Sequence, residues 1–359
     1  ASGDIVQSVG GDITVGGTID VEAFGGSITM ADGTVSRTTA GGNIRYEAAA
    51  GDVTLSTLDA RTAADRSSDT LFDQDNWGDV AVIASGNILD ANADQMDHDA
   101  DGFVVPLGTR VVNVFARGLQ LDTLGTIGEA GMFDVDGSTT LVPGNPLDLE
   151  ASTVAALAAD GIYLYESTDI TVDTVVFAGV DRIGLDSSTT AAVGAGSLSD
   201  LESTGGAVKL VADNGSITVN DGNPLVQGAG MSGVGVKAAG DVLLDSYNNG
   251  NLSEVVLNAV VDAGGSVGVY ADDTIYQNWV DANRSGSIRA GGTIEVESFD
   301  GDIVMADRTF SQTLGGNIRY AADGDVTMGV LDARAAPDRA AETLADQANW
   351  GDVQVIAGG

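Results

Sequence analysis

The sequence predicts an all-β fold, specifically a right-handed parallel β-helix (a β-solenoid) with loop excursions. Three observations lead to this prediction: a short glycine-led phrase recurs along the chain, apolar and polar residues alternate over four to six positions, and one long block occurs twice. The composition of 50 Gly, 5 Pro, 43% hydrophobic and 5% aromatic residues in 359 describes an ordered protein with an aliphatic core.

The recurring phrase consists of Gly, a small polar residue and a β-branched residue. We expect each phrase to form a corner followed by a strand, in which Gly supplies a positive φ, the polar side chain bonds back to the backbone of its own turn, and Ile or Val points inward. The phrase begins at Gly3, Gly11, Gly26, Gly42, Gly51, Gly78, Gly86, Gly215, Gly240, Gly286, Gly301, Gly316, Gly324 and Gly351. The residues predicted to lie in the core are Ile13, Ile28, Ile44, Val53, Val80, Ile88, Ile217 and Val242.

Successive phrases often lie eight or nine residues apart, as from Ile5 to Ile13 and from Ile19 to Ile28. A β-sandwich can have the same spacing, but the sequence has almost no two-residue hairpin turns of the Asn-Gly kind between strands, which favours a parallel solenoid. With ~20 to 25 residues per coil and ~4.8 Å between coils, a unit of about 275 residues would comprise about 12 coils and extend ~60 Å.

The repeated block identifies the repeat length. "GGNIRYEAAAGDVTLSTLDAR" returns as "GGNIRYAADGDVTMGVLDAR"; Gly16 aligns with Gly291 (291 − 16 = 275) and Trp77 with Trp350 (350 − 77 = 273), so two one-residue deletions separate the copies. We therefore expect residues 1–290 to be one full tandem repeat unit of β-helix coils. Residues 291–359 are then the start of the next unit, continuous with the same solenoid, in a segment of a longer array.

Two segments break the rhythm of corners and strands, and a third is ambiguous. "LDARTAADRSSDTLFDQDNW", repeated as "LDARAAPDRAAETLADQANW", and "DANADQMDHDADGFVVPLG" are predicted to leave the coil as excursions, the first with a short helical turn. "ASTVAALAADGIYL" is compatible either with a helix or with an Ala-rich coil, and the sequence alone does not choose between them.

The net charge of −38, from 53 acidic and 15 basic residues, argues against nucleic acid or an anionic membrane surface as a partner and favours cations. If aspartates at successive corners stack in register, like charges ~4.8 Å apart repel by about 0.9 kcal/mol even in water. We therefore expect stability to depend on salt or divalent cations. The absence of cysteine excludes disulfides and thiolate metal sites, and no run of 18 apolar residues predicts a membrane-inserted segment.

One stretch, "DANADQMDHDADG", resembles a calcium-binding loop. It contains the D-x-D-x-D-G opening in which alternate carboxylates converge on a hard cation and Gly permits the sharp turn. The twelfth position is Gly108, where an EF-hand has a bidentate Glu, so the remaining ligands would come from residues before the motif and from backbone carbonyls. A solvated acidic loop is the other interpretation. The predicted calcium ligands are Asp90, Asn92, Asp94, Asp97, Asp99 and Asp101.

Two other residue types could be given a function from the sequence. His98 is the only histidine, and we expect it to face solvent between two aspartates, since no Ser or Cys nucleophile constellation accompanies it. Trp77 and Trp350 hold the same place in the two copies, and we expect each to anchor its excursion against the coil rather than to stack on a sugar.

The run "LGTIGEAGMF…GNPLDLEASTVAALAADGIYLYESTDITV", with "GDVAVIASGNILDAN" upstream, resembles the β-strand-repeat stretches of giant bacterial surface exoproteins, the filamentous-haemagglutinin-like group. The resemblance covers most of the chain. It implies a secreted or cell-surface β-helical rod that acts as an adhesin, stalk or filament, and it implies no catalytic residues.

Two classes of function are therefore open. The first is a structural repeat of an extracellular rod, whose partners are neighbouring repeats, end to end or in filaments, with a glycan or a cell surface as further candidates. The alternative is a polysaccharide-binding or lyase-like β-helix, which would use calcium and a basic residue on one sheet face. We predict no enzyme, because the candidate basic residues recur in both copies, which suits pairing with nearby Asp better than a unique active site: Arg45, Arg61 and Arg66, repeated as Arg319, Arg334 and Arg339.

Overall fold

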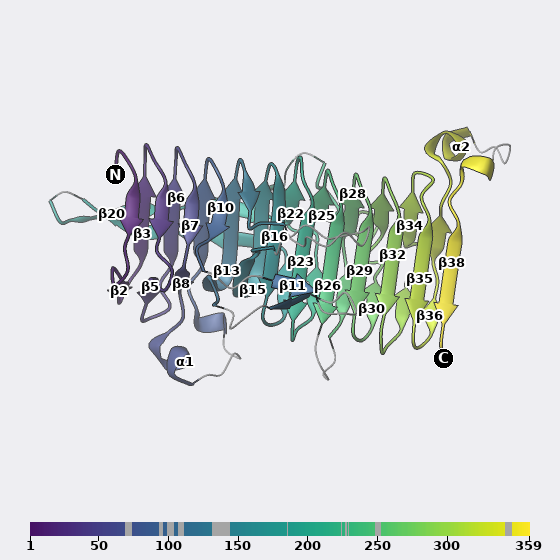
Figure 1. Cartoon of the computed structure of the whole chain (residues 1–359), viewed down its shortest axis with the longest axis horizontal. Coiled ribbons are helices and arrows are strands. Elements are labelled where there is room, and N and C mark those ends of the chain that lie inside the picture. The colour runs from purple at the N-terminus through teal and green to yellow at the C-terminus, as the bar shows by residue number, and fades with distance from the viewer. Residues whose placement is uncertain are drawn as a thin grey trace. The chain divides into compact units, whose positions relative to one another are not determined.

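The computed structural model describes residues 1–68, 74–92, 96–98, 104–106, 111–130, 144–184, 186–223, 225–226, 228, 230–247, 253–341 and 347–359. The chain divides into two compact units: unit 1 comprises Ala1–Tyr165 and Val175–Ser197, and unit 2 comprises Glu166–Thr174 and Leu198–Gly359. In each unit short strands follow one another coil after coil and pair in parallel (Figure 1). The predicted all-β parallel solenoid is therefore confirmed.

In unit 1 each regular coil contributes three strands, and each strand pairs with its equivalent in the next coil. The first row consists of β1 (Ile5–Gln7), β4 (Ile28–Met30), β7 (Val53–Leu55), β10 (Ile88–Asp90), β14 (Thr126–Ile127) and β16 (Gly161–Glu166). The second row consists of β2 (Ile13–Val15), β5 (Val35–Thr38) and β8 (Thr57–Asp59), and the third of β3 (Ile19–Ala23), β6 (Ile44–Ala48) and β9 (Val80–Ala84). The long strand β13 (Val114–Thr123) then pairs with both β8 and β9, and β15 (Leu147–Ala158) pairs along β13.

Unit 2 has the same three-row plan. The first row consists of β17 (Ile170–Val172), β24 (Ile217–Val219), β27 (Val255–Leu257), β30 (Ile275–Gln277), β33 (Ile303–Met305) and β36 (Val326–Thr327). The second consists of β22 (Leu201–Ser203), β25 (Val234–Ala238), β28 (Val260–Ala263), β31 (Ile288–Ala290), β34 (Phe310–Thr313) and β37 (Val330–Asp332). The third consists of β23 (Val208–Asp213), β26 (Val242–Tyr247), β29 (Val267–Ala271), β32 (Ile294–Ser298), β35 (Ile318–Ala322) and β38 (Val353–Ala357).

The length of a coil depends on whether it carries an excursion. Ile5 pairs with Ile28 and Ile28 with Val53, so these coils take about 23 and 25 residues, as expected from the sequence. Val53 pairs next with Ile88, and this longer coil contains the first excursion. Extra residues therefore leave the wall between strands without disturbing the parallel register.

The core is a set of aliphatic ladders that run from coil to coil. In the third row of unit 1, Ile44 pairs with Val80 and Val80 with Leu119, and all three are fully buried. Full burial of each such side chain stabilises the fold by roughly 1.5 to 3 kcal/mol relative to exposure. The predicted core is confirmed at Ile28, Ile44, Val53, Val80, Ile88, Ile217 and Val242. Ile13 is only half-buried, because its strand lies in the first coil and has a parallel partner on one side only.

The corners differ from the prediction in two ways. None of the phrase glycines, all of which the structure describes, has a positive φ. A Cβ at Gly51 would lie 2.9 Å from the backbone N of Ser27 in the preceding coil, and closer still to its Oγ. Glycine is required at Gly51, and likewise at Gly26, Gly42, Gly78 and Gly86, because the preceding coil approaches too closely for a side chain.

The polar residue after most of these glycines bonds to the next coil rather than to the backbone of its own turn. Asp4 Oδ1 accepts the N–H of Ser27 (2.9 Å), Ser27 Oγ that of Asp52 (3.1 Å), Asp52 Oδ1 that of Asn87 (2.6 Å) and Asn87 Oδ1 that of Thr126 (3.0 Å). In unit 2, a backbone N–H of the next coil is likewise accepted by the side chains of Asp241, Ser266 and Asn317. Charged and neutral acceptors alternate along this row in unit 1. The aspartates of this row therefore do not lie in adjacent coils, whereas the estimate of repulsion from the sequence assumed that they do.

The segment whose structure the sequence left open is a strand. "ASTVAALA" lies within β15, which pairs with β13 from Val114↔Leu149 to Asp122↔Leu157. The high helix propensity of Ala is overridden because this register buries Val154 and Ala156 in the coil.

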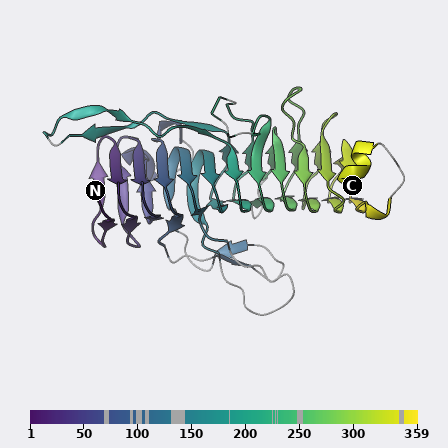
Figure 2. The same ribbon diagram turned by 90° about the horizontal axis from the view of Figure 1, so that it is seen from above.

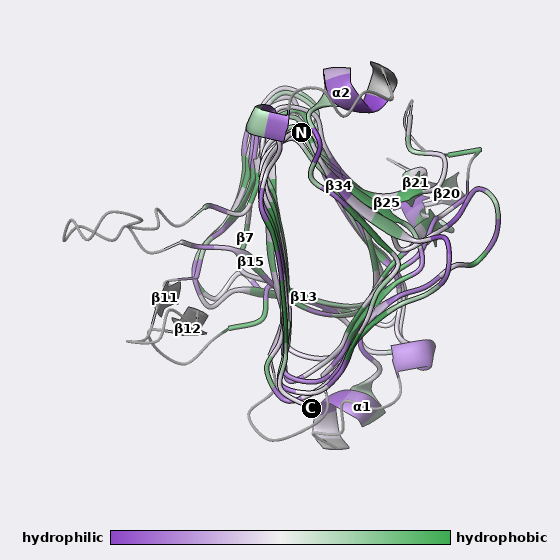
Figure 3. Ribbon diagram, turned by 90° about the vertical axis from the view of Figure 1, so that its right-hand side faces the viewer, coloured by the Kyte–Doolittle hydropathy of each residue, from purple (hydrophilic) through white to green (hydrophobic). Residues whose placement is uncertain are grey.

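The remaining elements lie outside the wall of coils. The repeated excursion contains helix α1 (Ala63–Ser68) and the 3-10 turn η1 (Gln74–Asn76) in unit 1, and α2 (Ala336–Ala341) and η2 (Gln347–Asn349) in unit 2, and Figure 3 shows α2 standing outside the strands. Two of the strand pairs outside the wall are antiparallel: β11 (Met96–His98) with β12 (Val104–Pro106), and β19 (Val180–Ile183) with β20 (Thr189–Val193). The strands β18 (Thr174–Phe177) and β21 (Gly196–Ser199) form a further two-stranded sheet. Among the described residues no helix is long and apolar enough to cross a membrane.

Candidate functional site

Asp90 and Asn92, the first two predicted calcium ligands, form hydrogen bonds within the wall of the solenoid. Asn92 is 3% exposed; its Oδ1 accepts a hydrogen bond from Ser56 Oγ (3.1 Å) and its Nδ2 donates to the carbonyl of Val111 (3.2 Å). Asp90 Oδ1 accepts the N–H of Asn92 (2.8 Å) and a bond from the Asn113 amide. The structure thus brings Asp90 and Asn92 together, in a buried network that joins β10 to the chain beyond residue 111.

The other predicted ligands lie in β11 or outside the described residues. Asp94, Asp99 and Asp101 lie outside the described residues, and Asp97 is described only as part of β11, opposite Val105. His98 likewise belongs to β11, and its side chain lies outside the described residues. Over the described ranges, no three His, Cys, Asp or Glu side chains gather closely enough to hold a metal ion.

The first excursion is held by a two-arginine clamp on Asp59. This carboxylate is 3% exposed and accepts bonds from Arg61 Nε and Nη2 (both 3.0 Å) and from Arg66 Nε (2.6 Å). Burial by itself raises the pKa of Asp59, but the bonds from Arg66 and Arg61 outweigh burial and hold it below its ordinary value. Arg66 also donates to the carbonyl of Thr38 (2.9 Å), which ties the excursion to β5.

Trp77 closes the excursion against the coil, as expected. It is 3% exposed, its Nε1 donates to Asp65 (3.2 Å), and its ring meets Phe115 edge-on at 6.5 Å. The guanidinium of Arg61 lies 3.5 Å from the centre of the Phe115 ring. An aromatic anchor buried in this way has no free face for a sugar.

The second copy repeats the clamp residue by residue. Asp332 accepts from Arg334 Nε and Nη2 (both 2.8 Å) and from Arg339 Nε (3.0 Å), and these bonds hold the pKa of Asp332 far below its ordinary range. Trp350 Nε1 donates to Asp338 (3.0 Å), as Trp77 does to Asp65. The excursion is therefore a folded, duplicated feature.

A buried polar triad was not anticipated from the sequence. Tyr46 is fully buried and its hydroxyl meets Ser36 Oγ (2.7 Å) and Gln7 Oε1 (3.2 Å) inside unit 1. Inside unit 2, Tyr320 makes the same contacts with Ser311 and Gln277. The sequence signal for this triad is a polar residue at an inward-facing position of each of its strands. Gln7 in β1 and Gln277 in β30 have the same role, although both precede the aligned block.

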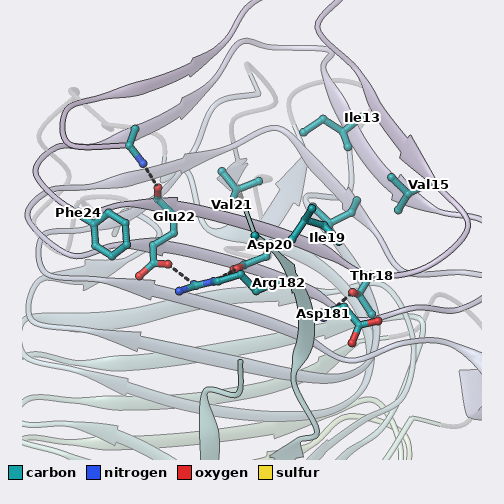
Figure 4. Close-up of a pocket in the computed structure, with 13 residues that line it drawn as sticks. Ile13, Val15, Thr18, Ile19, Asp20, Val21, Glu22, Phe24, Asp181 and Arg182 are labelled. Carbon is teal, nitrogen blue, oxygen red and sulfur yellow. Dashed lines mark hydrogen bonds and ion pairs between the residues drawn. The ribbon is translucent and has the colours of Figure 1, made fainter. Parts of the chain in front are cut away.

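A hairpin lies over the outer face of unit 1 and borders a surface cavity. The hairpin β19–β20 runs along the outside of the strands near the N-terminus (Figure 2), where Phe177 and Val180 pack on Ala81. A cavity of about 770 Å³ lies beside it, lined by β2, β3, Ala1 and Asp181–Gly184 (Figure 4).

Polar bonds fix the hairpin to the acidic edge of this cavity. Arg182 Nε donates to Asp20 (3.0 Å) and its Nη2 to Glu22, which raises the pKa of Arg182. Arg45 also pairs with Asp20 (2.8 Å), so two guanidinium groups share one carboxylate. The hairpin backbone also contributes, because the N–H of Asp181 donates to Thr18 Oγ1 (2.8 Å). The cavity floor is neutralised, which suits docking of chain on chain better than capture of a charged small molecule.

Comparison with known proteins gives no relative: no protein-family model, no curated protein and no solved structure matches the chain.

Proposed function

We propose that the chain is a structural repeat of a giant extracellular β-helical rod, which forms a surface filament, stalk or adhesin. The observation that carries this proposal is the duplication in three dimensions. The coils, the buried triad and the arginine clamp of the first copy all recur about 275 residues later with the same partners. Selection for a repeated shape explains this duplication, because a solenoid lengthens by adding equivalent coils.

The finer features of the rod follow from general rules. A right-handed coil is proposed because a connection between parallel strands of one sheet is right-handed in nearly all proteins. An extracellular, cell-surface location is proposed from the resemblance to surface exoproteins, with which the cysteine-free, acidic composition is compatible. The hairpin and the clamped excursions are the surfaces that a glycan or a cell would meet first.

A polysaccharide lyase is the weaker alternative. Such an enzyme needs a free basic residue to remove a proton. The six repeated arginines instead lie within ion-pair distance of carboxylates, and these partners include Asp20, Glu47, Asp59, Glu295, Glu297 and Asp332.

The rod is tested by electron microscopy of the native full-length protein, with the axial repeat as the measurement. A thin fibre with a regular axial repeat supports the proposal, and at ~4.8 Å per coil the measured period gives the number of coils in one repeat. A compact particle without an axial repeat contradicts it and favours the enzyme.

Stabilisation by calcium is part of the proposal, through the loop that contains Asp97, Asp99 and Asp101. Calorimetric titration with ~1 mM calcium is expected to give heat and a higher melting temperature, since carboxylate oxygens are the ligands calcium prefers. The triple variant Asp97→Asn, Asp99→Asn, Asp101→Asn is the control. If the unchanged chain gives neither heat nor a shift in melting temperature, the loop is merely acidic.

A further inference from the structure

We infer that the outer face formed by β32, β35 and β38, in the second copy of the duplicated block, is a docking surface. Its occupant is a hairpin equivalent to β19–β20 that belongs to another repeat unit. This inference rests on the proposed tandem rod and names one contact between its repeats. In unit 1 the hairpin occupies the equivalent face.

The polar groups that hold the hairpin in unit 1 are all conserved in type in the second copy. Thr18, Asp20, Glu22 and Asn43 bond to the hairpin, Asn43 through Nδ2 to the carbonyl of Gly179 (3.0 Å). Their equivalents in the aligned block are Thr293, Glu295, Glu297 and Asn317.

The amide of Asn317 has the orientation that the hairpin requires. In unit 1, Asn43 Oδ1 accepts the N–H of Asp79 (2.9 Å), which directs Nδ2 toward the hairpin. Asn317 Oδ1 accepts the N–H of Asp352 (2.8 Å) in the same way. The donor for a second hairpin carbonyl is therefore set by the corner itself.

The exposure of the acidic groups shows that the second face is uncovered. The side chains of Asp20 and Arg45 are 11% and 6% exposed beneath the hairpin, whereas those of Glu295 and Arg319 are 43% and 32% exposed. Arg319 spans Glu295 (2.9 Å) and Glu297 (2.7 Å), as Arg45 contacts Asp20 and Glu22. Two carboxylates, Glu295 and Glu297, share one arginine, so this face retains negative charge that can pair with an arginine equivalent to Arg182.

The copies also differ at the position beneath the apolar part of the hairpin, and this position locates the apolar part of the contact. Gln354 stands where Ala81 lies under Phe177 and Val180. The side chain of Gln354 is exposed, and a second hairpin would cover its aliphatic stem.

The decisive experiment extends the chain by its own sequence. Gly359 aligns with Gly86, so residues 87–290 appended after Gly359 continue the repeat and supply one further hairpin. Because the chain has no cysteine, Gln354→Cys gives a single thiol whose maleimide labelling rate reports coverage. The matched control is the same tandem protein with the appended copy of residues 178–195 replaced by a Gly-Ser segment of equal length.

We expect Gln354→Cys to react at least about tenfold more slowly in the tandem protein with the hairpin than in the control, since a docked hairpin must open before the thiol reacts. Equal rates in the two folded proteins overturn the inference. A fibre with a regular axial repeat together with equal rates would leave the rod intact and remove only the hairpin contact.

A second measurement decides the question if the tandem protein does not fold. A fluorescent peptide of residues 175–197 is titrated onto the 359-residue chain, and Glu295→Gln with Glu297→Gln is expected to weaken binding by about tenfold or more, because charge-assisted hydrogen bonds are lost. Glu202→Gln, which removes an ion pair with Lys237 on another strand, is the control. Absence of binding, or binding that the double substitution leaves unchanged, overturns the inference.

Discussion

At the scale of single residues, the corners work because small groups of one coil fit against the next. Gly26 and Gly86, like Gly51, lie against acceptors of the preceding coil, and each following Asp, Ser or Asn accepts a backbone N–H across the gap. The side chain thus replaces a hydrogen bond that the turning backbone cannot make.

Gly51→Ala is expected to reduce the free energy of unfolding by about 2 to 3 kcal/mol, because the added Cβ would push apart two coils at Ser27. Urea denaturation of purified protein measures the change. Gly16→Ala is the matched control, since a Cβ there meets nothing within 4 Å, and its effect should stay within about 0.5 kcal/mol. Equal losses in both variants would refute the close-approach explanation.

Glu150 makes stability depend on pH. It is 5% exposed, none of the described donors reaches its Oε1, and burial raises its pKa to about 7, with smaller effects of Arg61 and Asp59. The unfolded chain ionises first as pH rises, so the folded state holds more protons between about pH 4.5 and 7 and stability falls through that window.

Glu150→Gln is therefore expected to gain about 2 kcal/mol of stability relative to the unchanged chain between pH 5 and pH 8. Urea unfolding at the two pH values is the measurement. Glu129→Gln, at an exposed position, controls for loss of a charge. A pH-independent effect at position 150 would contradict the assignment.

At the scale of elements, the excursions are kept in place by charge pairing rather than by helix stability. A six-residue helix is too short to persist alone in water, so α1 depends on the bonds of Arg66 to Asp59, Thr38 and Arg61. The same holds for α2, which Arg339 ties to Asp332 and Thr313.

Asp59→Asn is expected to cost about 2 to 3 kcal/mol, because it leaves two arginines without their buried carboxylate. Asp332→Asn in the second copy is the comparison, and it should cost less, since the side chains of Asp332 and Arg334 are 11% and 37% exposed against 4% and 19% for Asp59 and Arg61. Thermal unfolding and proteolysis within residues 61–77 measure both. A larger loss for Asp332→Asn would contradict this ranking.

At the scale of the whole molecule, the net charge of −38 is distributed over a wall of closely spaced coils. Part of the repulsion is removed locally, because carboxylates share arginines and corner aspartates alternate with neutral acceptors in unit 1. The rest is long-range and is screened by salt.

The melting temperature is expected to rise between about 10 mM and 500 mM salt, as counterions screen the excess negative charge. Differential scanning calorimetry at fixed pH is the measurement. Equal melting temperatures would show that the local pairing already balances the charge.

The sequence by itself determined the all-β class, the alternation that buries Ile44 and Val80, and the tandem copy, because these depend on periods of a few residues or on direct identity. Only the tertiary structure decided why Gly51 is a glycine, what Asp52 bonds to, that residues 147–158 form a strand, and which face the β19–β20 hairpin covers. The physical reason is sequence separation. Each of these contacts joins residues from different coils, about 25 to 160 positions apart, and is specified by how the coils stack rather than by local pattern.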